Sequence, residues 1–100
     1  MSLNTQDLFI NDIKIDYVHL RTQQRNTRQC ITTVEGIPDK YDLKRIAKVC
    51  KKEFACNGCI EDDPIYGKVI KFQGNQKDNM KKFLSIVGIV PESHIKIHGS

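Results

Sequence analysis

The sequence of 100 residues has no tryptophan, only three prolines and six glycines, and no long apolar run. The scarcity of proline and glycine excludes the low-complexity and collagen-like classes. A membrane-spanning helix needs about 20 consecutive, mostly apolar residues, so we expect no membrane partner. The N-terminal residues also lack the basic segment and apolar run of a secretory signal, and we therefore predict a cytoplasmic protein.

Apolar residues make up 39% of the chain and charged residues 28%, which suits one globular domain with a modest core. The net charge of +4 indicates only a weak preference for anionic partners. The charges are segregated, however, into a basic run at residues 44–52, a second basic group at Arg21, Arg25 and Arg28, and an acidic cluster at residues 61–63. Such segregation creates local fields that the net charge does not reveal.

The first third of the chain predicts a tail and a β-hairpin. Residues 1–12 show no clear period and are predicted to form a flexible N-terminal tail, which leaves 13–100 as a single α/β domain. Apolar and polar residues alternate over 13–24, and strand-forming residues return over 30–36. The purely polar residues 24–29 between them are predicted to form the hairpin tip.

The clearest predicted helix follows a turn that contains Pro38. Apolar residues recur there at three- and four-residue steps, namely Leu43, Ile46, Ala47, Cys50 and Phe54. Asp39 or Asp42 is a suitable N-cap. Asn57 and Gly58 both tolerate the left-handed conformation, so we expect the helix to stop there.

The second half repeats this order of elements. Strands are predicted at 59–60 and 68–73, joined by an acidic connection, and a second helix with Asn75 as its N-cap ends at Gly88. A last strand is predicted within 93–98. The order is strand-strand-helix-strand-strand-helix-strand. It predicts an α+β fold, an open two-layer sandwich with both helices packed on one face of a mixed sheet.

The cysteines are the first candidates for chemistry, because Cys56 and Cys59 have ligand-like spacing. A structural zinc site usually needs a second close pair, and Cys30 and Cys50 are far apart in the sequence. A redox dithiol usually places the attacking cysteine at a helix N-terminus, whereas Cys56 falls at a predicted C-terminus. We predict reduced thiols and no metal. A small thiol or metal-dependent enzyme that uses Cys56 and Cys59 is the disfavoured alternative.

The acidic and histidine side chains are weaker candidates. Asp62 and Asp63 could form a carboxylate pair for metal or acid–base work, but a solvated turn is favoured, and repulsion of RNA is a further interpretation. His19, His94 and His98 belong to no recognisable nucleophile motif. We therefore predict that the protein is not an enzyme and needs no cofactor.

The basic groups favour a nucleic-acid partner. Arginines on a hairpin tip can bind phosphate bidentately or stack on a base, and uncharged amides beside them add donors and acceptors. Lysines on the polar face of the first helix would lie against phosphates, although a merely solvated face is the alternative for that helix. These candidates are Gln24, Arg25, Asn26 and Arg28 on the tip, and Lys44, Lys48, Lys51 and Lys52 on the helix.

Several segments in order, from about residue 17 to 99, carry a family resemblance. They are Gln-Gln-Arg-Asn at 23–26 with Arg28, Thr-Thr-Val-Glu-Gly-Ile at 32–37, Tyr-Asp-Leu-Lys-Arg-Ile at 41–46, Lys-Lys-Glu-Phe-Ala-Cys-Asn-Gly at 51–58, Phe-Gln-Gly-Asn-Gln at 72–76 and Ile-Lys-Ile-His-Gly at 95–99. Together they resemble the eukaryotic translation initiation factor 1 family.

The resemblance implies a factor that binds the small ribosomal subunit near the P site, promotes scanning and discriminates start codons. It implies ribosomal RNA contacts by the eight tip and helix residues given above. Asp62, Asp63, Pro64, Ile65 and Tyr66 would form a loop that faces initiator tRNA and repels its backbone. Asn75, Gln76 and Gly99 would be linked to fidelity. Other initiation factors would be further partners, and the free protein would be a monomer.

The chain departs from the usual family pattern at a few positions. Thr27 and Gln29 stand where glycine and lysine are common, and Asn75 and Lys77 stand where aspartate and arginine are common. A divergent or virus-encoded member would show such changes. Two other functions stay open: a reinitiation or ribosome-recycling factor of the same fold, and a protein-interaction module that uses the apolar residues 8–10.

Overall fold

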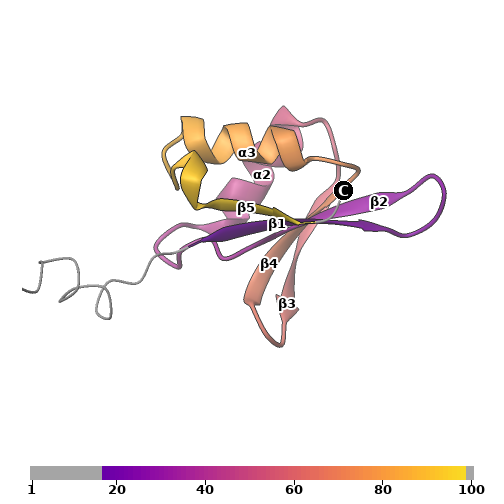
Figure 1. Ribbon diagram of the computed structural model, residues 1–100, viewed down its shortest axis with the longest axis horizontal. Helices are drawn as coiled ribbons and strands as arrows, with labels where there is room; N and C mark the ends of the chain where they lie inside the picture. The colour runs from indigo at the N-terminus through magenta and orange to yellow at the C-terminus, as the bar shows by residue number, and fades with distance from the viewer. Residues whose placement is uncertain (1–16, 99–100) are drawn as a thin grey trace, which may run out of the picture.

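The computed structural model describes residues 17–98, which form one five-stranded sheet with two helices on one of its faces (Figure 1). The elements are β1 (Val18–Gln24), β2 (Cys30–Glu35), α2 (Leu43–Glu53), β3 (Gly58–Asp63), β4 (Gly67–Gln73), α3 (Lys77–Ile86), a 3-10 turn η1 (Glu92–His94) and β5 (Ile95–His98). The predicted two-layer α+β fold and the order of its elements are confirmed. The predicted tail and the first residues of the predicted domain lie outside the described part of the chain.

The sheet has the strand order β3-β4-β2-β1-β5, so β2 is the central strand. It pairs antiparallel with β1 on one side and with β4 on the other, while β5 runs parallel to β1 at one edge. The strand β2 is paired along both of its edges, and its last four residues are all buried. Every other strand therefore takes its position, directly or through a neighbour, from β2.

Alternation along the strands sends large apolar side chains to the helix-covered face. Leu20, Ile70 and Phe72 are fully buried there. The helices contribute the matching residues Ile46, Ala47, Cys50, Met80 and Leu84. Each fully buried large apolar side chain contributes about 1.5–3 kcal/mol to folding. The predicted apolar stripe of the first helix is thus confirmed as its packing face.

The N-terminus of α2 is capped as predicted, but its C-terminus is not where the sequence suggested. Asp42 is the N-cap, and its carboxylate accepts hydrogen bonds from the backbone N–H groups of Lys44 and Arg45 at 3.0 and 3.4 Å. The helix ends before Asn57, because Ala55 adopts the left-handed conformation with φ 50°. The N–H of Cys56 then donates to the carbonyl of Lys51 at 3.0 Å, as in a Schellman motif.

Gly58 is not a helix stop but the first residue of β3, and it is required there for packing. A Cβ atom at this position would lie 2.8 Å from both the Lys71 carbonyl oxygen and Cδ1 of Phe72. The strand then continues through the acidic cluster as far as Asp63, so the prediction that residues 61–67 form a connection was wrong. Cross-strand pairing explains the difference, since Asp62 pairs with Lys68 and Asp63 with Gly67. Charged residues are also common on edge strands.

The start of α3 also differs from the prediction. Gln76, not Asn75, occupies the N-cap position, and it makes no side-chain cap. The Asn75 side chain accepts only a long hydrogen bond, 3.4 Å, from the N–H of Lys77. The hydroxyl of Thr32 in β2 instead accepts from the N–H of Gln76 at 2.8 Å and donates to the Gly74 carbonyl at 2.8 Å. A buried residue of the central strand therefore fixes this turn.

The strained residue after α2 gives the first test. We expect Ala55→Gly to raise the free energy of unfolding by about 1 kcal/mol, because glycine adopts positive φ without a steric penalty. Ala47→Gly, inside the same helix, should lower it by about 1 kcal/mol or more. Urea unfolding followed by circular dichroism measures both, and a loss of stability in Ala55→Gly would contradict the assignment of strain to Ala55.

Candidate functional site

The tip of the β1–β2 hairpin is organised by its uncharged residues. The side-chain oxygen of Asn26 accepts hydrogen bonds from the N–H groups of Arg28 and Gln29, both at 2.9 Å. The N–H of Arg25 donates to the Gln29 carbonyl at 2.8 Å, and the Gln24 amide donates to the Asn26 carbonyl. The side chains of Asn26 and Gln24 therefore stabilise the turn through hydrogen bonds to its backbone.

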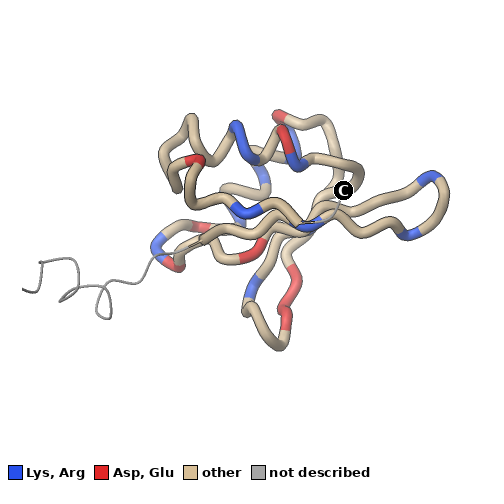
Figure 2. The backbone as a smooth tube through the Cα atoms, viewed as in Figure 1, with Lys and Arg blue, Asp and Glu red and all other residues tan. Residues whose placement is uncertain are grey.

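The two tip arginines are left for an external partner. Arg25 and Arg28 are both exposed, and neither takes part in the ion pairs found between residues 17 and 98. They lie at the end of the β1–β2 hairpin, which projects from the body of the domain and carries Lys or Arg at its tip (Figure 2). An exposed guanidinium with no ion-pair partner can use both of its N–H edges to bind phosphate.

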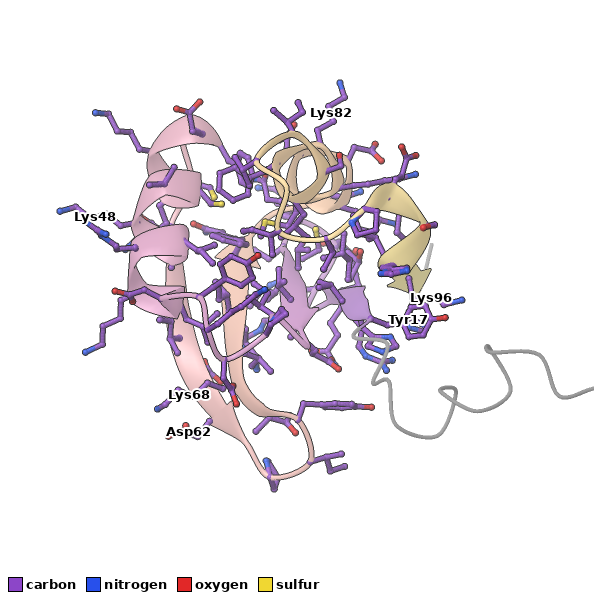
Figure 3. The ribbon with its side chains drawn as sticks, turned by 90° about the vertical axis from the view of Figure 1, so that its left-hand side faces the viewer. Tyr17, Lys48, Asp62, Lys68, Lys82 and Lys96 are labelled. Carbon is purple, nitrogen blue, oxygen red and sulfur yellow. The ribbon has the colours of Figure 1, made fainter. Side chains whose placement is uncertain are left out.

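The second basic group lies on α2, on the side opposite to its buried stripe. Lys44, Lys48 and Lys52 are exposed, and Lys51 is half-buried. Figure 3 shows Lys48 pointing away from the body of the domain. The structure thus keeps these lysines on one outer face, as their spacing predicted, and separates them from the hairpin tip.

Arg21 does not belong to the exposed basic group with Arg25 and Arg28. Its Nε donates to Oε1 of Glu35 at 2.8 Å, and its Nη2 donates to the Tyr66 hydroxyl at 3.3 Å. Its Cζ also lies 5.6 Å from the centroid of the Tyr66 ring, a cation–π distance. Glu35 is buried, and its Oε2 has no hydrogen-bond partner among residues 17–98. These three residues, the Arg21–Glu35–Tyr66 cluster, tie the β3–β4 turn to β1 and β2.

The acidic residues next to that turn have different environments. Asp63 accepts hydrogen bonds from the N–H groups of Ile65 and Tyr66 at 2.8 and 3.0 Å, and these bonds lower its pKa. Asp62 pairs with Lys68 at 3.2 Å, and both side chains are exposed at the end of the hairpin (Figure 3). Asp62 and Asp63 therefore lie in β3, and only Pro64, Ile65 and Tyr66 form the predicted loop. Asp63 shapes the turn, while Asp62 presents charge to solvent.

The predicted fidelity residues lie at the start of α3, apart from Gly99, which is outside the described residues. The Gln76 amide donates to the Gln73 carbonyl at 3.1 Å and accepts from Asn79 at 2.9 Å. The N–H of Gly74 donates to the Cys30 carbonyl at 2.8 Å. This turn is thus attached to β2 close to the base of the hairpin.

The cysteines are poorly suited to thiolate chemistry. All four are free thiols. Burial raises the pKa of Cys50 to about 12 and also raises the pKa of Cys56. Burial and the hydrogen bond to Glu61 raise the pKa of Cys59. Within residues 17–98, no group of three or more His, Cys, Asp or Glu side chains is placed to hold a metal ion.

Sequence reasoning missed Thr32 and Glu35, which position two of the predicted segments. Both stand in a run of strand-forming residues, where a buried carboxylate is unusual. The glutamate in that run was the available signal, because an acid in a central strand usually has a partner.

No helix of the described chain is long and apolar enough to cross a membrane.

The fold and these side chains define a small two-layer α+β domain that presents a basic hairpin tip, a lysine-bearing helix face and an acidic turn. Residues 14–90 match the family described as Translation initiation factor SUI1, and the chain belongs to this family. This is a family of initiation factors and not of enzymes.

Relatives from several organisms agree with the family assignment. Eukaryotic translation initiation factor eIF1 of Drosophila melanogaster is 45% identical over 105 residues, which cover 98% of this chain and 96% of the relative. Eukaryotic translation initiation factor 1 of Homo sapiens is 49% identical over 84 residues, covering 84% of this chain and 74% of the relative. The protein translation factor SUI1 homolog of Oryza sativa is 51% identical over 84 residues, with coverages of 84% and 73%.

A solved structure shares the fold. The crystal structure of the C-terminal domain of human eIF2D matches with a TM-score of 0.73 and 19% identity, over 83% of this chain and 43% of that one. At this identity the likeness supports the two-layer α+β architecture alone.

The Arg21–Glu35 pair gives the second test. Arg21→Ala should lower the free energy of unfolding by about 2–3 kcal/mol, because it leaves a buried carboxylate unpaired. The loss should lie at the low end for a buried pair, since the Arg21 side chain is 37% exposed. In a Glu35→Gln background the same change should cost less. Thermal or urea unfolding of the unmodified protein, the two single variants and the double variant measures the coupling free energy between the two side chains. Equal losses in both backgrounds would show that the two groups do not interact.

Proposed function

We propose that this protein is a cytoplasmic translation initiation factor that binds the small ribosomal subunit near the P site. The observation that carries the proposal is the hairpin tip, where Asn26 closes the turn and leaves Arg25 and Arg28 exposed. The names of relatives at 45% and 49% identity support the assignment to initiation. The free protein is a monomer, and other initiation factors join it on the subunit.

Binding uses ribosomal RNA phosphates and needs no cofactor. Arg25 and Arg28 enter an RNA groove on their hairpin, and Gln24 and Asn26 hold that hairpin in shape. Lys44, Lys48, Lys51 and Lys52 provide a second set of phosphate contacts. Each neutralised phosphate releases a condensed counterion, so the affinity falls as the salt concentration rises.

Discrimination of start codons uses charge of the opposite sign. The β3–β4 turn faces initiator tRNA, and the exposed carboxylate of Asp62 repels the tRNA backbone during scanning. Tyr66 is held by Arg21, so the turn keeps its position while the tRNA samples codons. A correct codon pairing stabilises the tRNA enough to displace the factor. Asn75, Gln76 and Gly99 adjust the stringency of this step.

The RNA contacts can be tested by binding of labelled protein to purified eukaryotic small subunits across a salt series. We expect the double variant Arg25→Ala/Arg28→Ala to bind more weakly and with a shallower salt dependence. The slope of log K against log salt should decrease in magnitude by about 1 for each phosphate that the variant no longer neutralises.

A charge-matched control separates specific contacts from net charge. Lys82→Ala/Lys96→Ala also removes two positive charges, from exposed positions on α3 and β5. It should leave the affinity and the slope close to those of the unmodified protein. Equal effects of the two double variants would show that the tip arginines have no special role.

The acidic turn can be tested in a reconstituted scanning assay. Asp62→Asn should raise initiation at near-cognate codons relative to AUG by about two- to fivefold, the size of a screened surface interaction of about 0.5–1 kcal/mol. Toeprinting on matched AUG and UUG messages measures the ratio. Glu92→Gln is the control, because Glu92 is also exposed and paired with a lysine, Lys81, at 3.0 Å. An unchanged ratio in Asp62→Asn would contradict the repulsion mechanism.

A further inference from the structure

A cleft of about 430 Å³ lies at the base of the β1–β2 hairpin, and of its lining residues only Arg25 has a role in the function proposed above. It is bounded by the hairpin on one side and by edge strand β3 on the other. Its lining includes Arg25, Ile31, Asn57, Cys59, Lys71 and Gln73. Its volume is within the range of sites that take small ligands.

The walls of the cleft come from three neighbouring strands. Ile31 pairs with Gln73 across β2 and β4, and Lys71 pairs with Cys59 across β4 and β3. Cross-strand partners project from the same face of a sheet, so these four side chains share the face that the helices do not cover. Ile31 is half-buried and supplies an apolar wall.

Two side-chain amides stand at the edge of the cleft. The Asn57 amide nitrogen donates to the Gln73 amide oxygen at 3.4 Å, which is long for a hydrogen bond. Both side chains belong to exposed residues. The Asn57 oxygen and the Gln73 nitrogen thus offer an acceptor and a donor close together. Amides in such an arrangement recognise the polar edges of bases.

The charges around the cleft favour an anionic group at its mouth. Glu61 is already compensated, since its Oε1 pairs with Lys71 at 3.1 Å and its Oε2 accepts from the Cys59 thiol at 3.5 Å. The pKa of Glu61 is lowered mainly by its hydrogen bond to Lys71 and also by the hydrogen bond from Cys59. Arg25 lines the same cleft and takes part in none of the ion pairs found between residues 17 and 98. Arg25 is the cation that this arrangement leaves for a phosphate.

We propose that the cleft binds one unstacked base of a single-stranded RNA segment. Asn57 and Gln73 contact the polar edge of the base, Ile31 packs against its face, and Arg25 binds the adjacent phosphate. An apolar peptide would leave the two amides unpaired, whereas a base satisfies them. The inference extends the proposed function, since the hairpin brings ribosomal or messenger RNA to the cleft, but it can be tested without the ribosome.

The test is an NMR titration of the full chain with pentanucleotides of each of the four bases and with an abasic pentamer of the same backbone. Base-bearing RNA should cause saturable shifts in the backbone amide signals of Ile31, Cys59 and Gln73. The abasic pentamer should bind more weakly and shift mainly the signals of the hairpin tip. Equal affinity and equal shifts for both probes would overturn the proposal.

Variants locate the binding site. Asn57→Ala and Gln73→Ala should each weaken binding of the preferred pentanucleotide by about five- to tenfold and leave the abasic pentamer unaffected. Arg28→Ala, outside the cleft, should weaken the binding of both probes to a similar extent.

Thermal unfolding checks that each variant is folded. Unchanged affinity for the pentanucleotide in folded Asn57→Ala and Gln73→Ala variants would also overturn the proposal. Small-subunit binding that persists in such a case retains the proposed function. Small-subunit binding that is unchanged in the tip variant Arg25→Ala/Arg28→Ala contradicts the proposed function, whatever the outcome for the amide variants.

Discussion

Burial of the central strand β2 on both faces is the constraint on which the other parts of the structure depend. On the helix-covered face, the hydroxyl of Thr32 holds the backbone of Gly74 and Gln76 and so fixes where α3 begins. On the opposite face, the carboxylate of Glu35 orients Arg21, which in turn contacts Tyr66 in the β3–β4 turn. Buried polar groups are costly unless they are paired, so each of these contacts has few alternatives. The β2 strand also leads directly from the hairpin tip, and one strand thus positions three of the predicted functional segments.

The fold keeps opposite charges apart without a large scaffold. The basic tip belongs to β1 and β2, whereas the acidic turn belongs to β3 and β4, and the two hairpins point in different directions (Figure 1). Screening in physiological salt limits interactions between exposed charges to about 8–10 Å. In the proposed function, this separation of the two hairpins lets one small domain attract RNA at one place and repel it at another. A free Arg21 would add a positive charge between the two hairpins, and its pairing with Glu35 neutralises that charge.

Local patterns were sufficient to predict much of the fold. Strand alternation, the apolar stripe of α2 and the cap at Asp42 depend on residues close in sequence, and these predictions are confirmed. The errors arose where distant residues decide the outcome. The strand β3 continues through acids because β4 pairs with it, and Gly58 belongs to β3 because a side chain there would collide with Lys71 and Phe72. The cleft could not be predicted for the same reason, since Ile31, Asn57 and Gln73 meet only through strand pairing.

The departures from the usual family pattern at the hairpin tip can now be explained in physical terms. Among residues 17–98, Ala55 is the only non-glycine residue with positive φ, so Thr27 stands in an ordinary conformation where the family commonly has glycine. The turn does not need glycine because the side chain of Asn26 closes it. Gln29, where lysine is common, contributes its carbonyl to Arg25 and its side-chain oxygen to the Asn26 amide at 3.4 Å. The tip therefore keeps its shape and has one positive charge fewer. In the proposed function this changes the strength of phosphate binding and not the way in which the two arginines are presented.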